Sequence, residues 1–387
     1  MTNKKVMIIP SRYPSEDMPL KGIFFKEQAK YLGEHGINVV VIYPEIRSIL
    51  DFSLKKISKF HFQKEISYND QITTYRKCNW NIIPLRFELG CKIWINEAVR
   101  LAEDYIKKNG TPTIIHAHCT LWGGYVAKIL SDRYKIPYVI TEHSTAYARL
   151  LIKDWQAKYI IEAFDSAKCI IPVSNPLKEL LMKYNSDENK FKVIPNVVDT
   201  EFFELKSDKL KSKKFVFLTV AFLSKKKSID LLIKAFHKAF EGNKEVFLYI
   251  GGDGDEKESL ELLVNKLKIQ DKVKFLGSLT RNEVKEYMEN ADVFVLPSQV
   301  ETFGVVFIEA LSTGLPVLGT KCGGPEDIIN ENVGLLINKN NLDELVLALR
   351  KLYRDCKKYN PIALRNYVIQ KFSKKAIVSQ IIKVYKD

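Results

Sequence analysis

Two glutamates eight positions apart, Glu301 and Glu309, have the types and spacing that most directly suggest chemistry in this sequence. The apolar run at 293–296 predicts a buried strand before them, and Phe303-Gly304 predicts the turn that opens a helix. Glu301 is then expected on a loop at the carboxyl end of the strand, and Glu309 on the second turn of the helix. Helix N-termini attract phosphate. The pair would therefore frame an anion and suit a ligand with hydroxyls at both ends and phosphates in the middle.

The same two carboxylates also fit a purely structural role. One would be a favourable charge near a helix start and the other would be part of an exposed helical face, and the spacing alone favours this interpretation.

A second loop supports a ligand site. The segment 221–228 follows a predicted strand and holds Lys225, Lys226 and Lys227. Three lysines at such a turn are typical of a diphosphate site, although a solvated turn would look similar. A nucleotide-sugar has the required layout of hydroxyls and phosphates.

Strands that alternate with helices must position these residues. This pattern predicts parallel sheets covered on both faces, and ligands of such sheets bind at the carboxyl ends of the strands. We therefore expect an α/β protein with two doubly wound, Rossmann-like domains that face each other across a shared cleft. The predicted strands are 6–9, 37–43, 113–115, 138–141 and 169–173 in the first half, and 215–220, 246–250, 273–276, 293–296 and 317–319 in the second.

Length and composition agree with two soluble domains. The 387 residues exceed one compact domain, and 46% are apolar. The polar stretch 183–190 interrupts the alternation and predicts the approach to a linker. We expect an acceptor-side domain at 1–188, a nucleotide-sugar-binding domain at 189–365, and a helix at 366–387 that packs back on the first domain.

The net charge of +14 implies an anionic partner. No helix-turn-helix, RNP or zinc-finger pattern is present, so nucleic acid is not expected. Phosphorylated substrates and an anionic membrane surface remain. Between Ile46 and Lys64, apolar residues recur at helical spacing with lysines between them. This pattern predicts either a basic helix at a membrane surface or an ordinary amphipathic helix that covers the sheet, and the sequence leaves both open.

Targeting and metal signals are weak throughout the chain. The apolar runs fall short of the roughly 18 residues of a membrane span, and the N-terminal run is too short for a signal peptide. We expect a cytoplasmic protein, peripheral on the inner face of the membrane.

The six cysteines lack metal-binding spacing, which indicates reduced thiols. His116, His118 and Cys119 favour a satisfied histidine or a substrate contact over a metal site, and Asp253-x-Asp255 favours a tight turn.

Taken together, these motifs resemble the retaining glycosyltransferases of the large family 4 (group 1), which have the GT-B fold. The resemblance covers nearly the whole chain. Its most specific part is Pro297-Ser298 followed by Glu301 through Glu309, the Glu-x7-Glu element of that family. Supporting matches are Gly22, His118, His143, Val173-Ser174, Ile194-Pro195-Asn196 with Asp199, the glycines around Asp253, Gly277, and Gly314-x-Pro316-Val317.

The resemblance implies roles for the residues of the second half. Glu309 would bind the ribose hydroxyls, and Glu301 the hydroxyls of the donor sugar. The backbone at Phe303, Gly304 and Val305 would take the diphosphate, helped by Lys226 and Lys227. No metal or other cofactor would be required.

In the first half, the resemblance implies that Gly22 approaches the phosphates from the facing domain. His143 would line the sugar site as a catalytic group together with Glu301 and Lys227, and His118 would lie on the acceptor side. One departure matters for the donor site. The family usually has Gly-Arg where this chain has Ala221-Phe222, so the basic partner of Lys227 is missing, and Lys225 or Lys226 is the candidate substitute.

The function implied is transfer of a sugar, with retention, from a nucleotide-diphosphate sugar to a glycan or lipid-linked acceptor in cell-surface polysaccharide biosynthesis. Lysines and helix amides would stabilise the leaving diphosphate, and no carboxylate nucleophile would be needed, unlike in glycosidases. Two alternatives stay open from the sequence. They are a nucleotide-sugar epimerase of the same fold and a non-catalytic protein that binds anionic surfaces.

Overall fold

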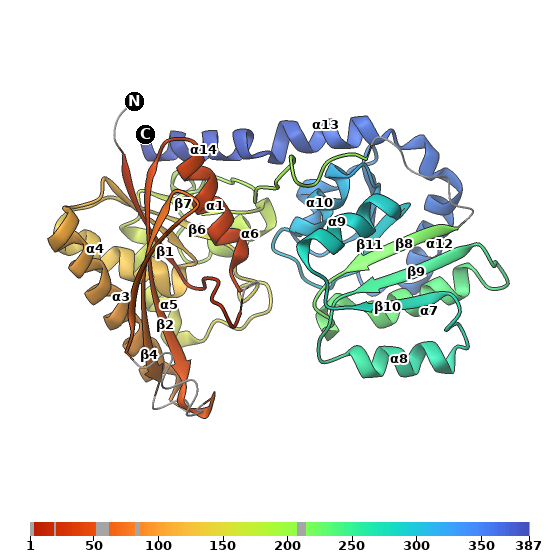
Figure 1. The fold of residues 1–387 in the computed structure, drawn as a ribbon, viewed down its shortest axis with the longest axis horizontal. Coiled ribbons are helices and arrows are strands. Elements are labelled where there is room, and N and C mark those ends of the chain that lie inside the picture. Colours follow the sequence, from red (N-terminus) through yellow and green to blue (C-terminus); the bar gives the residue numbers. More distant parts are fainter. Residues whose placement is uncertain (1–3, 19–20, 52–61, 82–85, 207–213, 387) are drawn as a thin grey trace. The chain divides into compact units, whose positions relative to one another are not determined.

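The computed structural model describes residues 4–18, 21–51, 62–81, 86–206 and 214–386, and these form two compact units. Unit 1 comprises 1–173, 178–194 and 378–387, and unit 2 comprises 174–177 and 195–377. Each unit has its own sheet and its own set of covering helices (Figure 1).

The sheet of unit 1 has seven strands in the order β3-β4-β2-β1-β5-β6-β7. All neighbouring pairs are parallel except β3 with β4, which is antiparallel. The central strands are apolar on both faces, as a doubly covered sheet requires, and Val6 to Ile9 of β1 are fully buried. The strands are β1 (Lys5–Pro10), β2 (Asn38–Ser48), β3 (Lys64–Asn69), β4 (Ile72–Asn81), β5 (Ile114–His118), β6 (Tyr138–Glu142) and β7 (Cys169–Pro172).

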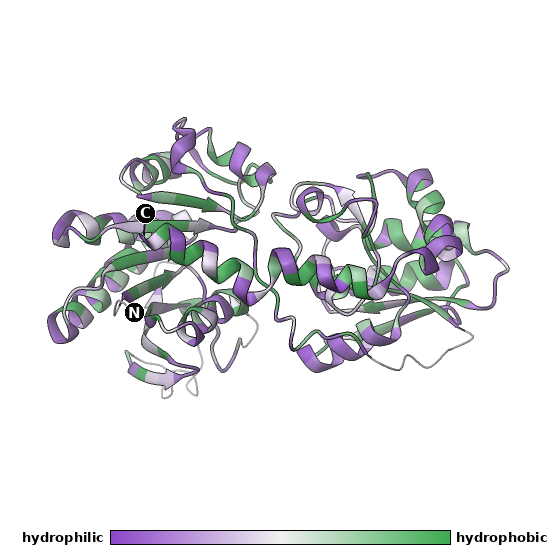
Figure 2. Cartoon of the chain, turned by 90° about the horizontal axis from the view of Figure 1, so that it is seen from above, coloured by the Kyte–Doolittle hydropathy of each residue, from purple (hydrophilic) through white to green (hydrophobic). Residues whose placement is uncertain are grey.

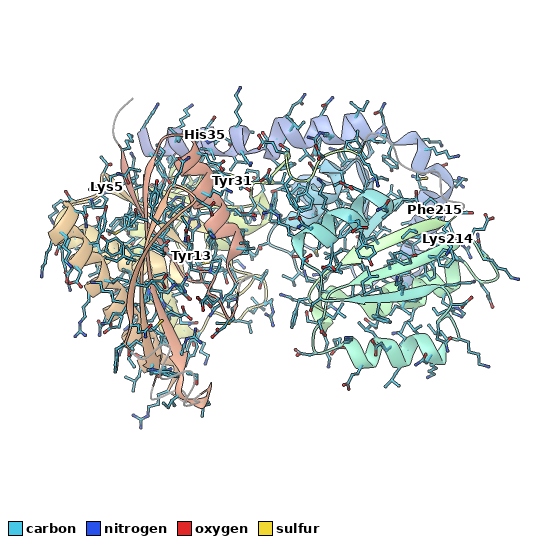
Figure 3. All side chains as sticks on the ribbon, viewed as in Figure 1. Lys5, Tyr13, Tyr31, His35, Lys214 and Phe215 are labelled. Atoms are coloured by element: carbon cyan, nitrogen blue, oxygen red, sulfur yellow. The ribbon has the colours of Figure 1, made fainter. Side chains whose placement is uncertain are left out.

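The helices of this part of the chain cover both faces of the sheet. α3 packs on β2 and β4, whereas α1 and the end of α14 lie on the face from which His116 and His118 project. Just after α1, His35 Nδ1 donates a hydrogen bond to the carbonyl oxygen of Tyr31 over 2.7 Å, and both residues are labelled in Figure 3. The helices are α1 (Ile23–Glu34), α3 (Phe87–Asn109), α4 (Tyr125–Tyr134), α5 (Asp154–Asp165), α6 (Asn175–Leu181) and α14 (Lys374–Lys386), with short turns at Ile49–Asp51, Thr120–Gly124 and Glu188–Lys190.

Unit 2 has a six-stranded, wholly parallel sheet in the order β10-β9-β8-β11-β12-β13. Apolar strands and the apolar stripes of helices meet in its core (Figure 2). The elements are β8 (Phe215–Val220), α7 (Ile229–Ala239), β9 (Val246–Gly251), α8 (Lys257–Lys266), β10 (Val273–Gly277), α9 (Arg281–Asn290), β11 (Val293–Leu296), α10 (Val305–Ser312), β12 (Val317–Lys321), α11 (Pro325–Ile328), β13 (Gly334–Asn338), α12 (Leu342–Asp355) and α13 (Pro361–Phe372), with short turns at Lys225–Lys227 and Cys356–Lys358.

The predicted pair of doubly wound α/β sheets is confirmed. The helix predicted from Ile46 to Lys64 is wrong at both of its ends, because 46–48 continue β2 and Lys64 begins β3. Pairing of β2 with β4, from Val39 opposite Ile72 to Ser48 opposite Asn81, outweighs the helical periodicity there. Residues 52–61 of that segment lie outside the described residues. No helix in the described ranges has the length and apolar character needed to cross a membrane.

Candidate active site

Strand order in unit 2 brings three loops together at one edge of the sheet. β8, β11 and β12 are neighbours, and in a parallel sheet the loops after them meet at the carboxyl edge. Backbone hydrogen bonds join these loops. Gln299 N–H donates to Lys226 O over 2.8 Å, and Gly324 N–H donates to Glu301 O over 2.8 Å. The loop that carries Glu301 is therefore held from both sides.

The side chain of Glu301 meets Lys227 at this edge. Its carboxylate forms an ion pair with Lys227 Nζ and accepts a hydrogen bond from Ser298 Oγ at 2.8 Å. Both charged side chains are nearly withdrawn from water, with 14% of Lys227 and 11% of Glu301 exposed. Two residues 74 positions apart thus form one polarised pair in which the ammonium and carboxylate balance each other.

Cys322 lies beside this pair and is not an activated nucleophile. Burial raises the pKa of its thiol to about 11, and the nearby Glu301 carboxylate adds to that effect. The thiol is therefore protonated at neutral pH, when a cysteine nucleophile would need to be a thiolate.

Gly304 starts helix α10 in a conformation that favours glycine. Its φ is +95°, and a Cβ there would lie 2.7 Å from Cδ2 of Phe307. The first amides of α10, beginning at Val305, have no acceptor four residues earlier within the helix, and among them Phe307 N–H donates to Gly304 O over 3.0 Å. Phe303 is buried just before the turn and packs edge-on against Phe372 at 5.8 Å. Glu309 lies half-buried on the second turn, so the loop and helix positions predicted for the two glutamates are confirmed.

The three lysines of the 221–228 loop differ in their surroundings. Lys227 pairs with Glu301, Lys226 is half-buried, and Lys225 is exposed. Phe222, which stands where the family usually has arginine, is 61% exposed. Asp253 and Asp255 are also exposed, and Asp253 Oδ1 accepts from Gly254 N–H in a tight turn. Among the described residues, no group of three His, Cys, Asp or Glu side chains is placed to hold a metal ion.

The residues predicted in unit 1 also gather at a carboxyl edge. Gly22 lies in the loop after β1, His118 is the last residue of β5, and His143 follows β6, and these three strands are adjacent. His118 Nδ1 and His143 Nε2 are 3.2 Å apart, and the Phe25 ring lies 4.9 Å and 5.0 Å from these two imidazoles. Gly22 has a φ of +70°, and a Cβ there would lie 2.7 Å from Arg12 O. The helix that starts at Gly22 therefore packs directly against both histidines.

Glu142 fixes the His143 loop, although the sequence analysis assigned it no role. This fully buried carboxylate accepts hydrogen bonds from the N–H groups of His143 at 2.9 Å and Ser144 at 2.8 Å. It also accepts from the N–H and Oγ1 of Thr120, at 2.8 and 2.7 Å, and from the hydroxyl of Tyr147 at 3.2 Å. An acidic residue at the end of an apolar strand was the only sequence signal for this role.

His116 connects this site to the last helix. Its Nδ1 is 2.6 Å from the hydroxyl of Tyr385, and its Nε2 is 2.6 Å from Thr141 Oγ1. Burial lowers the pKa of His116 to about 3, so the ring is neutral at physiological pH. Both ring nitrogens are engaged, which agrees with the predicted satisfied histidine. Tyr385 was not identified from the sequence, because nothing local links it to position 116.

His118 stacks between the other two imidazoles. Its ring centre is 4.5 Å from that of His116 and 5.5 Å from that of His143. Burial, together with the two neighbouring histidines, holds the pKa of His118 well below its usual range. Its Nε2 is buried and has no hydrogen-bond partner within the part of the chain that the structure describes. The three rings thus form a stacked column that ends at His143.

Comparison with known proteins identifies the family. Residues 22–202 match the model named Glycosyltransferase Family 4, and residues 201–386 match the model named Glycosyl transferases group 1. An uncharacterized glycosyltransferase of Methanocaldococcus jannaschii is 30% identical over 314 residues, which cover 75% of this chain and 80% of that protein. The chain therefore belongs to glycosyltransferase family 4. It is a retaining enzyme of the hexosyltransferase type that transfers a sugar from a nucleotide-sugar.

Solved structures confirm the GT-B fold. Sucrose-phosphate synthase of Thermosynechococcus elongatus superimposes with a TM-score of 0.79 at 21% identity, covering 99% of this chain and 98% of that one. HepE of Anabaena, solved in complex with UDP-glucose, gives a TM-score of 0.74 at 19% identity, and the match covers 99% of both chains.

A second relative is similar in sequence along most of its length. The putative teichuronic acid biosynthesis glycosyltransferase TuaC of Bacillus subtilis is 27% identical over 370 residues, which cover 90% of this chain and 88% of that protein.

Proposed function

We propose that this glycosyltransferase extends a glycan or a lipid-linked acceptor during the synthesis of a cell-surface polysaccharide. The paired Lys227 and Glu301 beside the start of α10 are the observation that carries the donor side of this proposal. The similarity to TuaC along most of both chains supports the polysaccharide context. The complex of HepE with UDP-glucose makes UDP-sugars the first donors to test.

The loop before α10 and the helix itself would contact successive parts of the bound donor. Glu301 accepts hydrogen bonds from sugar hydroxyls, the amides that start at Val305 bind the diphosphate, and Glu309 accepts from the ribose hydroxyls. The backbone at Phe303 and Gly304 is shaped by packing and by the positive φ of the glycine. Such an arrangement binds charge with fixed dipoles, which need little reorganisation during the reaction.

Lys227 would stabilise the leaving group. In the free protein its ammonium is balanced by Glu301. A bound donor brings phosphate oxygens that compete for the ammonium and hydroxyls that compete for the carboxylate, so the pair would exchange partners on binding. Lys226, on the same short turn, supplies a second positive charge where the family arginine is replaced by Phe222.

The reaction then needs no protein nucleophile. The bond between the anomeric carbon and the diphosphate oxygen breaks, and a bond to the acceptor oxygen forms on the same face of the sugar. The acceptor proton passes to the departing phosphate oxygen. His143 would line the sugar site and His118 would support it from the acceptor side, held by Glu142 and Phe25.

A donor screen followed by a transfer assay tests this function. Thermal shift with a panel of UDP-, GDP- and ADP-sugars should raise the melting temperature for the true donor by mass action. NMR of the product formed with a glycan acceptor should then show the anomeric configuration of the donor. Stabilisation by no nucleotide-sugar, or epimerised donor in place of a glycoside, would contradict the proposal.

We further propose that the enzyme works at the inner face of the membrane. The net charge of +14 supports attraction to anionic lipid. The segment Ile46 to Lys64 stays a candidate contact only in part, since 46–48 belong to β2. Sedimentation with vesicles of phosphatidylglycerol, compared with phosphatidylcholine vesicles, should show binding that weakens as salt rises. Equal binding to both lipids, or binding to neither, would argue against it.

A further inference from the structure

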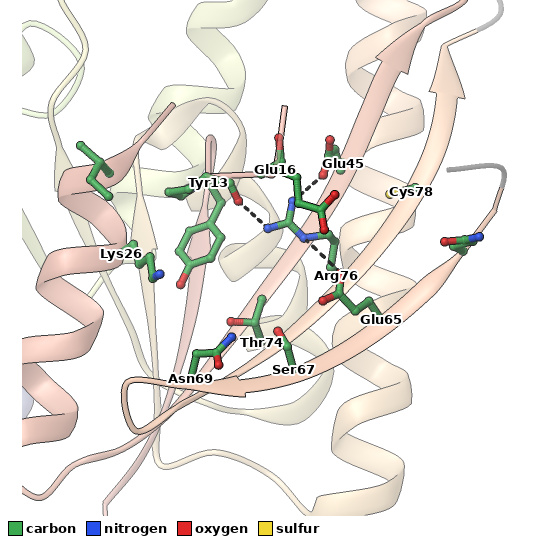
Figure 4. Close-up of a pocket in the computed structure, with 14 residues that line it drawn as sticks. Tyr13, Glu16, Lys26, Glu45, Glu65, Ser67, Asn69, Thr74, Arg76 and Cys78 are labelled. Atoms are coloured by element: carbon green, nitrogen blue, oxygen red, sulfur yellow. Dashed lines mark hydrogen bonds and ion pairs between the residues drawn. The ribbon is translucent and has the colours of Figure 1, made fainter. Parts of the chain in front are cut away.

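Unit 1 contains a cavity of about 440 Å³ beside the loop that follows β1 (Figure 4). This volume lies in the usual range for small-molecule sites, about 300–1,000 Å³. Its walls come from that loop, the first turn of α1, β2, and the β3–β4 hairpin. The roles proposed above for the donor site use none of its lining residues.

Strand alternation gives the hairpin a polar face toward the cavity. Successive side chains of a strand point to opposite faces, and in the register Ser67 lies opposite Thr74 and Glu65 opposite Arg76. All four line the cavity. Tyr68, one position along on β3, belongs to the other face and is 70% exposed. The hairpin therefore presents these four polar side chains to the cavity.

Ion pairs fix the cavity floor before any ligand binds. Glu45 is 3% exposed, and its two carboxylate oxygens pair with Arg47 and Arg76. Arg76 also donates to Pro14 O and approaches Glu65 at 4.0 Å. Its dashed contacts in Figure 4 show it joining the loop to the strands. Arg47 ties the same loop through Asp17 at 2.8 Å. The guanidinium of Arg76 is therefore already neutralised within the protein.

The other groups of the lining are mainly neutral donors and acceptors. Ser15 Oγ is buried and has no hydrogen-bond partner among the described residues, a cost that a ligand would relieve. Ser67, Thr74 and Asn69 add two hydroxyls and an amide (Figure 4). Both basic side chains of the lining are already paired, Arg76 with Glu45 and Lys26 with Asp70 at 3.6 Å.

We propose that this cavity binds a neutral sugar residue of the acceptor. Because its basic side chains are already paired, the lining offers little attraction to phosphate or uronate groups, whereas the partnerless Ser15 hydroxyl and the other hydroxyls and amide suit the alternating donors and acceptors of a neutral sugar. That the sugar belongs to the acceptor rests on the function proposed above. The cavity thus acts as a specificity site that rejects anionic acceptor residues.

Sugar binding can be tested without any transferase assay. Saturation-transfer NMR would use the methyl glycosides of glucose, galactose, mannose and N-acetylglucosamine, with methyl glucuronide as the anionic probe. We expect saturation of at least one neutral glycoside. Ser67→Tyr should abolish it by filling the cavity, and a tyrosine suits an edge strand. The matched control is Tyr68→Ser, which changes the other face of the same strand and should leave binding unchanged.

Each result separates this inference from the proposed function. No saturation of a neutral glycoside, equal saturation in Ser67→Tyr, or stronger saturation of the glucuronide would overturn the neutral-sugar site. Calorimetry with nucleotide-sugars tests the donor site independently, and its failure would leave the glycoside result standing. Given an active donor and acceptor pair, Ser67→Tyr should raise the acceptor KM at least tenfold with the donor KM unchanged. An unchanged acceptor KM would overturn the acceptor assignment.

Discussion

Lys227 and Glu301 form an ion pair at the carboxyl edge of the second sheet, where the loops after β8 and β11 meet. The two side chains belong to different loops, and Ser298 holds the carboxylate from a third direction at 2.8 Å. Because both are largely buried, each charge depends on the other for compensation. A ligand that separates the pair must offer an anionic group to Lys227 and hydrogen-bond donors to Glu301.

Lys227→Gln should therefore lower kcat/KM by about 10²–10³, the usual effect of removing one group that stabilises developing charge. The matched control is Lys225→Gln on the same turn, because Lys225 is exposed. Its kcat/KM should stay within about threefold of wild type. Steady-state kinetics on both variants measures this difference. An equal loss of kcat/KM in both would mean that only the total positive charge of the turn contributes to catalysis.

Gly304→Ala should destabilise unit 2 by more than a positive φ alone explains. A left-handed conformation costs a non-glycine residue about 1–2 kcal/mol, and here the new Cβ would also press on Phe307. Gly242→Ala separates these causes, since Gly242 has a φ of +75° and nothing within 4 Å of the added atom. Melting temperatures should fall further for Gly304→Ala. Similar melting temperatures for the two variants would show that the N-terminal turn of α10 adapts.

Tyr385→Phe should weaken both stability and catalysis. It leaves the buried Nδ1 of His116 without its partner at 2.6 Å, at a cost of about 1–3 kcal/mol. The stacked histidines then transmit the change toward His143. Tyr138→Phe is the control, because it removes an equally buried hydroxyl bond to Ala163 O that lies outside the histidine column. We expect similar melting temperatures but a lower kcat only in Tyr385→Phe. Equal kcat values would make the Tyr385 contact purely structural.

Stability should fall as the pH drops below about 6.5, the pKa of an unfolded histidine. Folded His116 has a pKa of about 3, so between these values the unfolded chain binds a proton that the folded chain does not. By linkage, this group alone lowers the unfolding free energy by about 1.4 kcal/mol per pH unit as the pH falls. Melting temperatures of His116→Gln from pH 6 to pH 4 should therefore decline less steeply than those of wild type. The control His35→Gln alters an exposed histidine at the end of α1 (Figure 3), and its decline should match wild type. An unchanged slope in His116→Gln would refute this origin of acid sensitivity.

Local sequence patterns predicted much of the fold because buried parallel strands are short apolar runs. The strand at 293–296 was predicted with the bounds that β11 has, and Glu301 and Glu309 were placed on the correct elements. The β3–β4 hairpin was missed, since its polar alternation and exposed β3 resemble a loop. The structure of that segment depends on strand pairing between distant residues, which a short stretch of sequence does not reveal.

The candidate site residues were proposed from motifs, whereas the groups that hold them in place were not identified. Tyr385 contacts His116 across 269 positions, and no motif marks it. Glu142 gave only a weak signal, because a single acidic residue after an apolar strand is common. The contact of Lys227 with Glu301 was also not predicted, although both residues were assigned to one ligand. Partners that are distant in sequence become visible only once the strand order is known.

The most direct test of the account is kcat/KM for Glu301→Gln with the nucleotide-sugar donor, measured beside the affinity for the nucleoside diphosphate alone. Glu301 is assigned to the sugar, so we expect kcat/KM to fall about 10²–10³. The diphosphate should bind as tightly as before or more tightly, since Lys227 loses its competing carboxylate. Wild-type kcat/KM in Glu301→Gln would contradict the account.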